Sequence, residues 1–412
     1  MEQEKPLSKI KVLELSTFVC GPTTARLLAD MGAEVIKVES LKGDSWRRSG
    51  VSFLPYRFEE KENPIFDIYN TGKKHISLNL KTSEGMEVFE RLLSEADVFV
   101  TNVRPASLKK LKLSYEDLKE KYPRLIYASV SGYGEKGPDA HKPAFDTATF
   151  WARGGFLRDM SAMKEDYEPV LAPIGVGDTA TAYLLVAEIC ASLYRREVTG
   201  KGDSVTSGLY HNAIFCLGTM LLMAQPPFGR NYPYNRVDNG VPEGCYKCAD
   251  GEWVYFALGD PSVNLPRIVA LIGHPDLLED SRFSPDKRWE NRYEFYAYFR
   301  DAFLTKTADE WVKLGEEYDV TLVRAAHFKE VCEDAQAWEN GYLERVTFPN
   351  GHEDTVPVSP IEMDSVGKVS TRPAPACGAD TVLILKSLGY TDEAIARMQE
   401  GGAIGIAKDV SN

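Results

Sequence analysis

The sequence predicts an α/β fold, with a doubly wound, Rossmann-like parallel sheet in a large domain and a smaller α+β domain beside it. The N-terminal third alternates short apolar runs with amphipathic helical stretches, which is the rhythm of βαβ units. The composition changes after about Ala224, where Gln225-Pro226-Pro227 interrupts the chain. The length of 412 residues leaves room for two domains.

The large domain is predicted element by element from its apolar periodicity. Pro22 suits the first turn of a helix that runs to Met31 and stops at Gly32. A second helix, Ser83–Ala96, has one apolar face. The predicted strands are Lys11–Leu15, Val35–Val38, Ile76–Leu80, Val98–Val100 and Ile126–Val130.

The smaller domain is predicted from short strands that precede a helical block. Thr307 and Glu310 form a capping box inside that block. Beyond it, Thr347–Thr355 is typical of a hairpin that turns at Asn350-Gly351. The remaining predicted elements are strands Gly244–Lys247 and Trp253–Leu258, the block from about Asn264 to Tyr318, and closing helices Asp380–Leu388 and Thr391–Gln399.

Composition narrows the class of protein. A hydrophobic fraction of 43% and a charged fraction of 26% are typical of a soluble globular protein. The net charge of −13 argues against a general nucleic-acid or membrane-surface binder. The polar start of the chain shows no signal peptide, and the seven cysteines are scattered. We therefore expect reduced thiols and a cytoplasmic location.

Several cofactor classes are disfavoured by the motifs. Cys245 and Cys248 form one CxxC without the second pair that a zinc site needs, so we expect a structural role and no metal. The first βαβ unit imitates a dinucleotide fold, but its turn Ser16–Pro22 has no GxGxxG. GxSxG, HExxH and P-loop patterns are absent from the sequence.

Polar and basic residues follow three predicted strands. Ligands of open α/β sheets bind beyond the carboxyl ends of the strands, and here those ends lead into Thr17–Gly21, Thr101–Pro105 and Ser131–Pro138. Arg104, Lys110 and Lys136 lie in or near these segments, and Lys73 belongs to a further basic cluster. Such runs are often solvated faces, but together they indicate a ligand that carries phosphate.

The segment Gly175-Val176-Gly177-Asp178 places a carboxylate at the start of a long apolar helix. Asp is a good N-cap, and the helix dipole favours negative charge there. We therefore expect Asp178 to stay ionised at neutral pH, as a carboxylate nucleophile must. On this segment alone, a structural cap and a nucleophile both remain open.

A set of motifs in a fixed order resembles the class III CoA-transferases, the family of formyl-CoA transferase and carnitine CoA-transferase. The likeness covers nearly the whole chain. Within the family, Ser131–Gly155, with Ala337-Trp338 and Phe348-Pro349, is most similar to the phenyllactate and 2-hydroxyacyl branch. The matching motifs are Gly32–Glu39, Ser131–Gly134, Gly137-Pro138, Phe145-Asp146, Gly154-Gly155, Gly177-Asp178, Thr199–Gly202 and Leu388–Tyr390.

This resemblance implies an enzyme that moves CoA from an acyl-CoA to a carboxylic acid, here a 2-hydroxy acid of the 2-hydroxyisocaproate or aryl-lactate type. Asp178 would be the nucleophile, with an acyl-aspartyl anhydride and an aspartyl-CoA thioester as intermediates. CoA would be a substrate, with no tightly bound cofactor. Backbone N–H groups around Gly177 or in the Gly132–Gly137 loop are candidates to stabilise the oxyanion.

The resemblance also implies CoA contacts, with departures from the family pattern. Thr17 and Val19 replace a His and a Gln in the turn that wraps the nucleotide, and Ser40 replaces an Arg. The glycine-rich lid loop of the formyl-CoA branch, expected near Gly259-Asp260-Pro261, is absent. The full set of predicted contacts is Thr17, Val19, Cys20, Ser40, Lys73, Asn102, Arg104, Lys110, Tyr133 and Lys136.

Family members form an interlocked homodimer of two threaded rings, in which both ends of the chain build the large domain. We therefore expect residues 1–224 to form the CoA-binding domain with the catalytic Asp, 225–327 the small domain, and 328–412 a return to the large one. The expected partners are an acyl-CoA, a carboxylic acid and a second copy, with no nucleic acid or membrane. A link to a 2-hydroxyacyl-CoA dehydratase is also implied.

Two alternatives remain. An acyl-CoA racemase of the same fold needs a His before Asp146 as half of a two-base pair, and this chain has Phe145 there. A non-catalytic CoA-binding protein would have no use for Asp178 in its glycine frame. For the acyl group, an apolar pocket is an open interpretation of four aromatic residues that otherwise belong to the core, Trp46, Phe150, Trp151 and Phe156.

Overall fold

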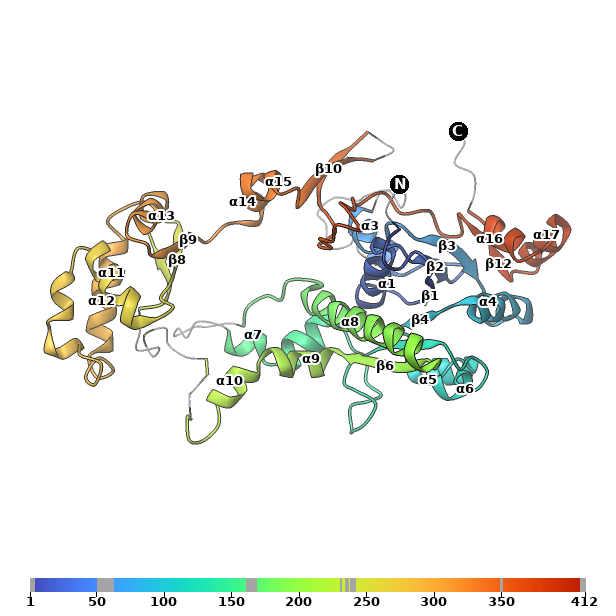
Figure 1. Cartoon of the computed structure of the whole chain (residues 1–412), viewed down its shortest axis with the longest axis horizontal. Coiled ribbons are helices and arrows are strands. Elements are labelled where there is room, and N and C mark those ends of the chain that lie inside the picture. The colour runs from blue at the N-terminus through green and yellow to red at the C-terminus, as the bar shows by residue number, and fades with distance from the viewer. Residues whose placement is uncertain are drawn as a thin grey trace. The chain divides into compact units, whose positions relative to one another are not determined.

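The computed structural model describes residues 4–49, 63–160, 169–229, 232–233, 237, 242–348 and 351–407. The chain forms two compact units (Figure 1). The first contains Met1–Phe156, Ala172–Leu221 and Ala335–Asn412, and the second contains Leu157–Leu171 and Leu222–Asp334.

The first unit is built on a seven-stranded sheet in the order β12-β3-β2-β1-β4-β5-β6. Its first six strands pair in parallel, whereas β12 is antiparallel to β3. The parallel part has the strand order of a Rossmann-type sheet, as the sequence predicts. The strands are β1 (Lys11–Leu15), β2 (Glu34–Glu39), β3 (Lys74–Leu78), β4 (Val98–Thr101), β5 (Ile126–Ser131), β6 (Asp203–Gly208) and β12 (Ile404–Gly405).

Helices cover both faces of this sheet because its buried strands are apolar on both sides. On one face, α1 (Cys20–Asp30) and α8 (Val176–Thr199) pack against Val12, Val35 and Val100. The opposite core, which includes Leu13, Ile76 and Phe99, packs against α4 (Ser83–Glu95), α5 (Pro105–Leu111), α6 (Tyr115–Leu118), α16 (Thr381–Ser387) and α17 (Asp392–Glu400).

Helix α8 is long and apolar enough to cross a membrane by length and composition alone. It nevertheless packs as a core helix, because Ala182, Leu185 and Ile189 are fully buried. Length and apolar composition are therefore weak evidence for a membrane span here. Several of its other apolar side chains, among them Tyr194 and Val198, are exposed.

The first unit also contains shorter elements. The predicted hairpin is present as β10 (Leu343–Thr347) paired antiparallel with β11 (Glu353–Pro357), although Pro349 and Asn350 lie outside the described residues. The helices are α2 (Trp46–Ser49), α3 (Pro64–Asn70), a π-helix (Thr147–Arg153), α9 (Leu209–Cys216) and α15 (Ala335–Glu339); α7 (Phe156–Asp159) and α10 (Gly218–Met223) cross the division between the units.

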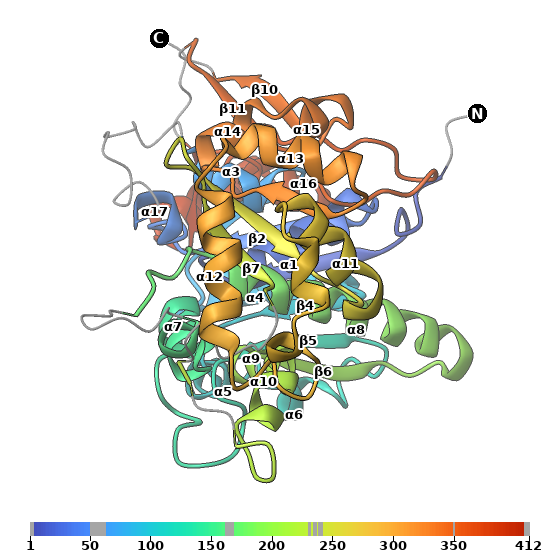
Figure 2. The same cartoon turned by 90° about the vertical axis from the view of Figure 1, so that its left-hand side faces the viewer.

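The second unit packs helices around a three-stranded antiparallel sheet (Figure 2). Its core includes Tyr246, Phe299 and Trp311, and Thr307 forms the predicted capping box. The strands are β7 (Gly244–Lys247), β8 (Trp253–Ala257) and β9 (Thr321–Arg324). The helices are α11 (Pro261–Leu271), α12 (Arg292–Phe303), α13 (Ala308–Glu317), α14 (Phe328–Glu333) and the 3₁₀ turns Pro275–Leu278 and Ser281–Phe283.

Candidate active site

The carboxyl ends of β1 and β4 meet where the strand order of the sheet reverses. The Thr17 N–H donates to Asn102 Oδ1 over 3.0 Å, and Asn102 Nδ2 donates to the Thr17 carbonyl over 2.6 Å. This reciprocal pair joins the two strand ends into one surface. In doubly wound sheets such a switch point is where ligands bind.

Helix α8 begins beside this switch point, and its N-terminus is held by Asp146. Gly175 occupies the N-cap position with a φ of +82°, and its N–H donates to Asp146 Oδ2 over 2.8 Å. Asp178 lies in the first turn and makes no capping hydrogen bond. Of the two interpretations that the sequence leaves open, the structural cap is therefore not supported, because Gly175 is the N-cap residue and the carboxylate of Asp146 accepts its N–H.

The Asp178 carboxyl is half-buried, and among the described residues no hydrogen bond or ion pair engages it. Burial, with a contribution from the charge of Asp146, raises its pKa to about 7. We expected the helix terminus to keep Asp178 fully ionised. Desolvation and a like charge instead outweigh the helix dipole, so the group is poised between its two protonation states at neutral pH.

Asp146 is the less solvent-exposed of the two residues. Burial raises its pKa, although the N–H groups of Gly175, Asp178 and Gly177 act in the opposite direction. Gly177 is therefore a poorer candidate for an oxyanion donor than the sequence suggests, because its N–H faces Asp146. The Gly132–Gly137 loop stays a prediction for that role.

The glycine at 177 is required by close packing. A Cβ there would lie 2.3 Å from Asp146 Oδ1 and 2.3 Å from Phe150 Cγ, which is far inside van der Waals contact. Phe150 stacks on Phe156 and contacts Trp151. Phe150 and Trp151 are both buried, and Phe150 packs against the first turn of α8. The structure therefore favours a place in the core for these two residues over a place in an acyl pocket.

Three further side chains reach the start of α8. Val19 Cγ1 and Tyr69 Oη lie 3.6 Å and 3.1 Å from the position that a Cβ of Gly175 would take. Burial and the charge of Asp178 raise the pKa of the Cys20 thiol well above its usual value and that of Tyr69 to about 12. The predicted residue Val19 thus lies against the Gly175 turn, and the thiol of Cys20 is close enough to be affected by the charge of Asp178.

Lys73 belongs to a buried network of ion pairs at the end of β1. The Lys73 ammonium lies 2.7 Å from Glu14 Oε2 and donates to Asn70 Oδ1 and the Pro22 carbonyl. Burial lowers the pKa of Lys73 to about 7, partly offset by Glu14. The prediction that Lys73 lines the CoA channel is not supported, because its ammonium is enclosed and already satisfied.

The other predicted CoA contacts are more accessible. Arg104 is exposed at the N-cap of α5, after β4, and Lys110 is exposed on α5 itself. Lys136 is exposed in the loop after β5. Tyr133 is half-buried beside Tyr210, with ring centroids 6.2 Å apart. Ser40 is exposed after β2, where its hydroxyl donates to the Gly43 carbonyl.

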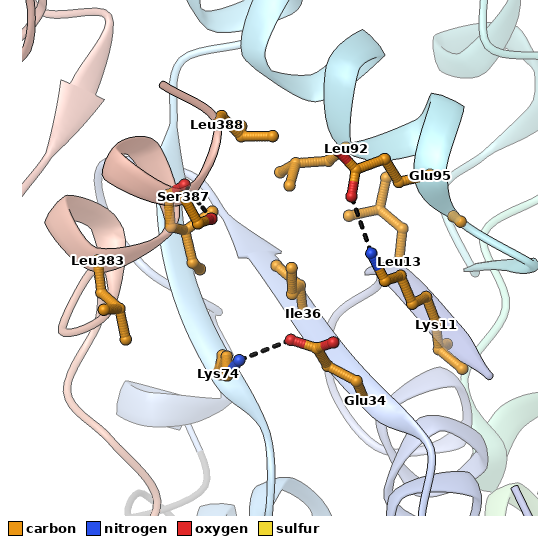
Figure 3. Close-up of a pocket in the computed structure, with 13 residues that line it drawn as sticks. Lys11, Leu13, Glu34, Ile36, Lys74, Leu92, Glu95, Leu383, Ser387 and Leu388 are labelled. Atoms are coloured by element: carbon orange, nitrogen blue, oxygen red, sulfur yellow. Dashed lines mark hydrogen bonds and ion pairs between the residues drawn. The ribbon is translucent and has the colours of Figure 1, made fainter. Parts of the chain in front are cut away.

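A cavity of about 400 Å³ lies at the opposite ends of the strands (Figure 3). Lys11, Glu34 and Lys74 are the first residues of β1, β2 and β3, and helices α4 and α16 close the cavity. Its charged side chains neutralise each other as Lys11–Glu95 and Lys74–Glu34 ion pairs. The cavity therefore presents no reactive group, unlike the surface around Asp178.

Among the described residues, no group of three or more His, Cys, Asp or Glu side chains could hold a metal ion. Cys248 is buried and Cys245 is half-buried. The chemistry that the described site offers is that of a desolvated carboxylate beside an open strand-end surface.

Comparison with known proteins gives a consistent result. The profile of CoA-transferase family III matches residues 7–381. The (R)-2-hydroxy-4-methylpentanoate CoA-transferase of Clostridioides difficile is 38% identical, over 97% of this chain and 99% of its own length. The cinnamoyl-CoA:phenyllactate CoA-transferase of Clostridium sporogenes is 36% identical, over 98% of both chains.

Solved structures show the same fold. Rv3272 from Mycobacterium tuberculosis, in an orthorhombic crystal form, superposes with a TM-score of 0.78 at 29% identity, over 93% of this chain and 99% of that one. A CAIB/BAIF family protein from Brucella suis gives a TM-score of 0.77 at 27% identity, over 94% of this chain and all of that one.

Proposed function

The chain belongs to CoA-transferase family III, and from that premise we propose that its acceptor is a 2-hydroxy acid of the 2-hydroxyisocaproate or aryl-lactate type. It is a transferase that uses CoA thioesters as substrates. The two relatives that support the acceptor class are named for 2-hydroxy-4-methylpentanoate and phenyllactate, and each matches nearly the whole chain.

We propose Asp178 as the nucleophile. The observation that carries this role is that Asp146 takes the Gly175 N–H and leaves the Asp178 carboxyl without a hydrogen-bond partner among the described residues. A carboxylate tied to a helix terminus would have to break that bond before attacking. Burial also removes water from the carboxylate and so makes it more basic and more nucleophilic.

In the proposed reaction, an Asp178 oxygen attacks the thioester carbonyl, the C–S bond breaks, and CoA leaves as a thiolate. The thiolate then attacks the aspartyl carbonyl of the anhydride, which releases the donor acid and forms an aspartyl-CoA thioester. The acceptor carboxylate attacks that thioester and expels CoA again. Attack of the thiolate on the new acyl carbonyl gives the product acyl-CoA and restores Asp178. Each step needs water to be excluded, because anhydride and thioester hydrolyse.

We propose that CoA lies along the surface where β1 and β4 end. Thr17, Val19, Cys20, Asn102 and Tyr133 would line it. The exposed cations Arg104, Lys110 and Lys136 stand on the neighbouring segments and would meet the phosphates, with Ser40 at the rim. Lys73 has no direct contact in this proposal.

The racemase alternative is weaker on this geometry. It needs two bases on opposite sides of an α-carbon, and the position before Asp146 holds Phe145, which has no basic atom. Asp146 itself is buried and engaged with Gly175. A non-catalytic CoA-binding protein is disfavoured because it would have no use for the Asp178 carboxyl, which has no hydrogen-bond partner among the described residues.

We further propose an interlocked homodimer that works in the cytoplasm without a tightly bound cofactor and supplies a 2-hydroxyacyl-CoA dehydratase, as in amino-acid fermentation. Exposed apolar side chains on neighbouring helices support the dimer. On α8, Tyr194 and Val198 are 76% and 72% exposed, and on α9 Phe215 is 82% exposed. Large apolar patches on a surface usually mark an interface.

The acceptor class is tested by incubating the protein with 2-hydroxy-4-methylpentanoyl-CoA and phenyllactate and following phenyllactyl-CoA by mass spectrometry. We expect transfer by the wild type and none by Asp178→Ala, with CoA binding by calorimetry retained in the variant. Transfer by Asp178→Ala would contradict the assignment of the nucleophile. A wild type that transfers CoA to no 2-hydroxy acid would contradict the acceptor class.

A further inference from the structure

We propose that Phe145, supported from behind by Phe18, forms an aromatic wall beside Asp178 that selects acids with an apolar side chain over small acids and dicarboxylates. This inference rests on the proposed function and deepens it. The two residues come from separate segments, the turn after β1 and the start of the π-helix, and meet edge to face with ring centroids 5.7 Å apart.

Phe145 presents its ring to the outside although the residues around it are held in place. It is 53% exposed, whereas the following Asp146 is buried and accepts the Gly175 N–H. The Phe145 carbonyl accepts the Thr149 N–H over 2.8 Å. An exposed aromatic ring on a fixed backbone, one residue from the carboxyl that holds α8, is suited to contact a substrate.

Phe18 has a strained backbone that is held by a buried ion pair. Its φ is +66°, a left-handed conformation that costs a bulky residue roughly 1–2 kcal/mol. Asp44 Oδ1 accepts the Phe18 N–H over 3.2 Å, and Asp44 Oδ2 lies 3.0 Å from Lys37 Nζ, with both charged side chains fully buried. The positive φ of Phe18 is unfavourable, and the contacts of Asp44 hold the turn in this one conformation.

Two short segments of the chain connect the wall to the Gly175 turn, at which α8 begins. Phe18 precedes Val19, which lies against the Gly175 turn, and Phe145 precedes Asp146, which holds that turn. Trp46 closes the cluster behind Phe18, with ring centroids 5.9 Å apart. Trp46 is buried and so belongs to the support of the wall, which leaves Phe145 as the surface that an acyl chain would meet.

The chemistry of this surface predicts which acids fit. A benzyl or isobutyl side chain would bury apolar area against the Phe145 ring. The second carboxylate of a dicarboxylic acid would instead lose hydration against the apolar ring, and the negative charge of the neighbouring Asp146 would oppose it. A methyl side chain, as in lactate, would gain little from the ring.

The wall is tested by measuring kcat/KM for phenyllactate, 2-hydroxy-4-methylpentanoate, lactate and succinate as acceptors, with cinnamoyl-CoA as the fixed donor. In Phe145→Ala we expect the ratio of kcat/KM for phenyllactate to that for lactate to fall about 10–100-fold. Phe145→Leu should recover most of the ratio for 2-hydroxy-4-methylpentanoate, because it restores an apolar surface. Phe328→Ala, which removes an 89% exposed phenylalanine from the second unit, is the matched control and should leave the ratios unchanged.

Two outcomes would overturn the wall while the proposed function stands. An equal loss for all four acceptors in Phe145→Ala would show that Phe145 serves the fold or the chemistry and not selectivity. Unchanged ratios would show that the acyl chain does not touch it. Absence of transfer by the wild type would instead overturn the proposed function, and the thermal unfolding of each variant separates both cases from misfolding.

Discussion

At the residue scale, the carboxyl groups of Asp146 and Asp178 differ in their contacts at the start of α8. Asp146 accepts a hydrogen bond from the Gly175 N–H, and Asp178 has a raised pKa and no hydrogen-bond partner among the described residues. The sequence alone indicated the importance of Asp178 through its glycine frame. The role of Asp146 could not be predicted from the sequence, because Asp146 and Gly175 are 29 positions apart and meet only in the folded chain.

Because the pKa of Asp178 is raised, ionisation of this carboxyl lowers the free energy of unfolding at neutral pH. Its pKa is about 7 in the native state and near 3.8 in the unfolded chain, so stability is lost as the pH rises from about 4 to about 7. Asp178→Asn removes that loss. We expect its free energy of unfolding to exceed that of the wild type by about 1–3 kcal/mol above pH 7, measured by urea denaturation.

The pH dependence is the decisive part of this measurement. The difference between Asp178→Asn and the wild type should shrink toward zero near pH 4, where the wild-type carboxyl is protonated in the native state. Asp364→Asn, at an exposed position, serves as the control and should show no such dependence. A constant difference across this pH range would contradict a buried, desolvated Asp178.

The charge of Asp146 should be visible in the kinetics. Attack requires the ionised carboxylate, so we expect the rate of CoA release from acyl-CoA in a single turnover to rise with pH and to level off above about 7. Asp146→Asn keeps an acceptor for Gly175 but removes the like charge. It should move the midpoint to lower pH by about 0.5–1 unit. A midpoint that stays in place would show that burial alone sets the pKa.

At the element scale, the start of α8 depends on glycine for space. A Cβ at Gly177 would overlap Asp146 and Phe150. We expect Gly177→Ala to lower the free energy of unfolding by about 1–3 kcal/mol and to reduce the rate of transfer, since the first turn of the helix must shift. Thermal or urea unfolding and the transfer assay measure the two effects.

Gly218→Ala provides the matched control for that substitution. Gly218 also lies at the start of a helix, α10, and a Cβ there meets nothing within 4 Å. Helix propensity predicts an unchanged or slightly higher stability, by at most about 1 kcal/mol. Equal behaviour of the two variants would contradict the close approach of Asp146 and Phe150 to Gly177.

Elements with strong apolar periodicity could be predicted, and weakly patterned ones could not. The ranges Lys11–Leu15 and Gly244–Lys247 match the structure residue for residue. The bounds of strand β6 could not be predicted, because Asp203–Gly208 is mostly polar and its pairing partner β5 lies about 75 residues earlier in the chain. Strand β12 has only two residues and exists because β3 pairs with it.

At the scale of the whole molecule, the exposed apolar side chains of α8 and α9 predict an assembly. We expect wild-type protein to sediment at twice the mass of one chain. The double substitution Tyr194→Glu with Phe215→Glu places two charges on this surface and should shift the protein to monomer. Leu278→Glu, on a half-exposed residue of the second unit, is the control and should leave the dimer intact. A wild-type monomer would contradict the proposal.

Mass spectrometry after reaction with an acyl-CoA and hydroxylamine tests the central claim most directly. Hydroxylamine attacks the activated aspartyl carbonyl of an anhydride or thioester and converts that side chain to a hydroxamate. We predict a modified peptide containing Asp178, dependent on acyl-CoA and absent in Asp178→Ala. Transfer activity with an unmodified Asp178, or a hydroxamate at another carboxyl such as Asp146, would contradict the account.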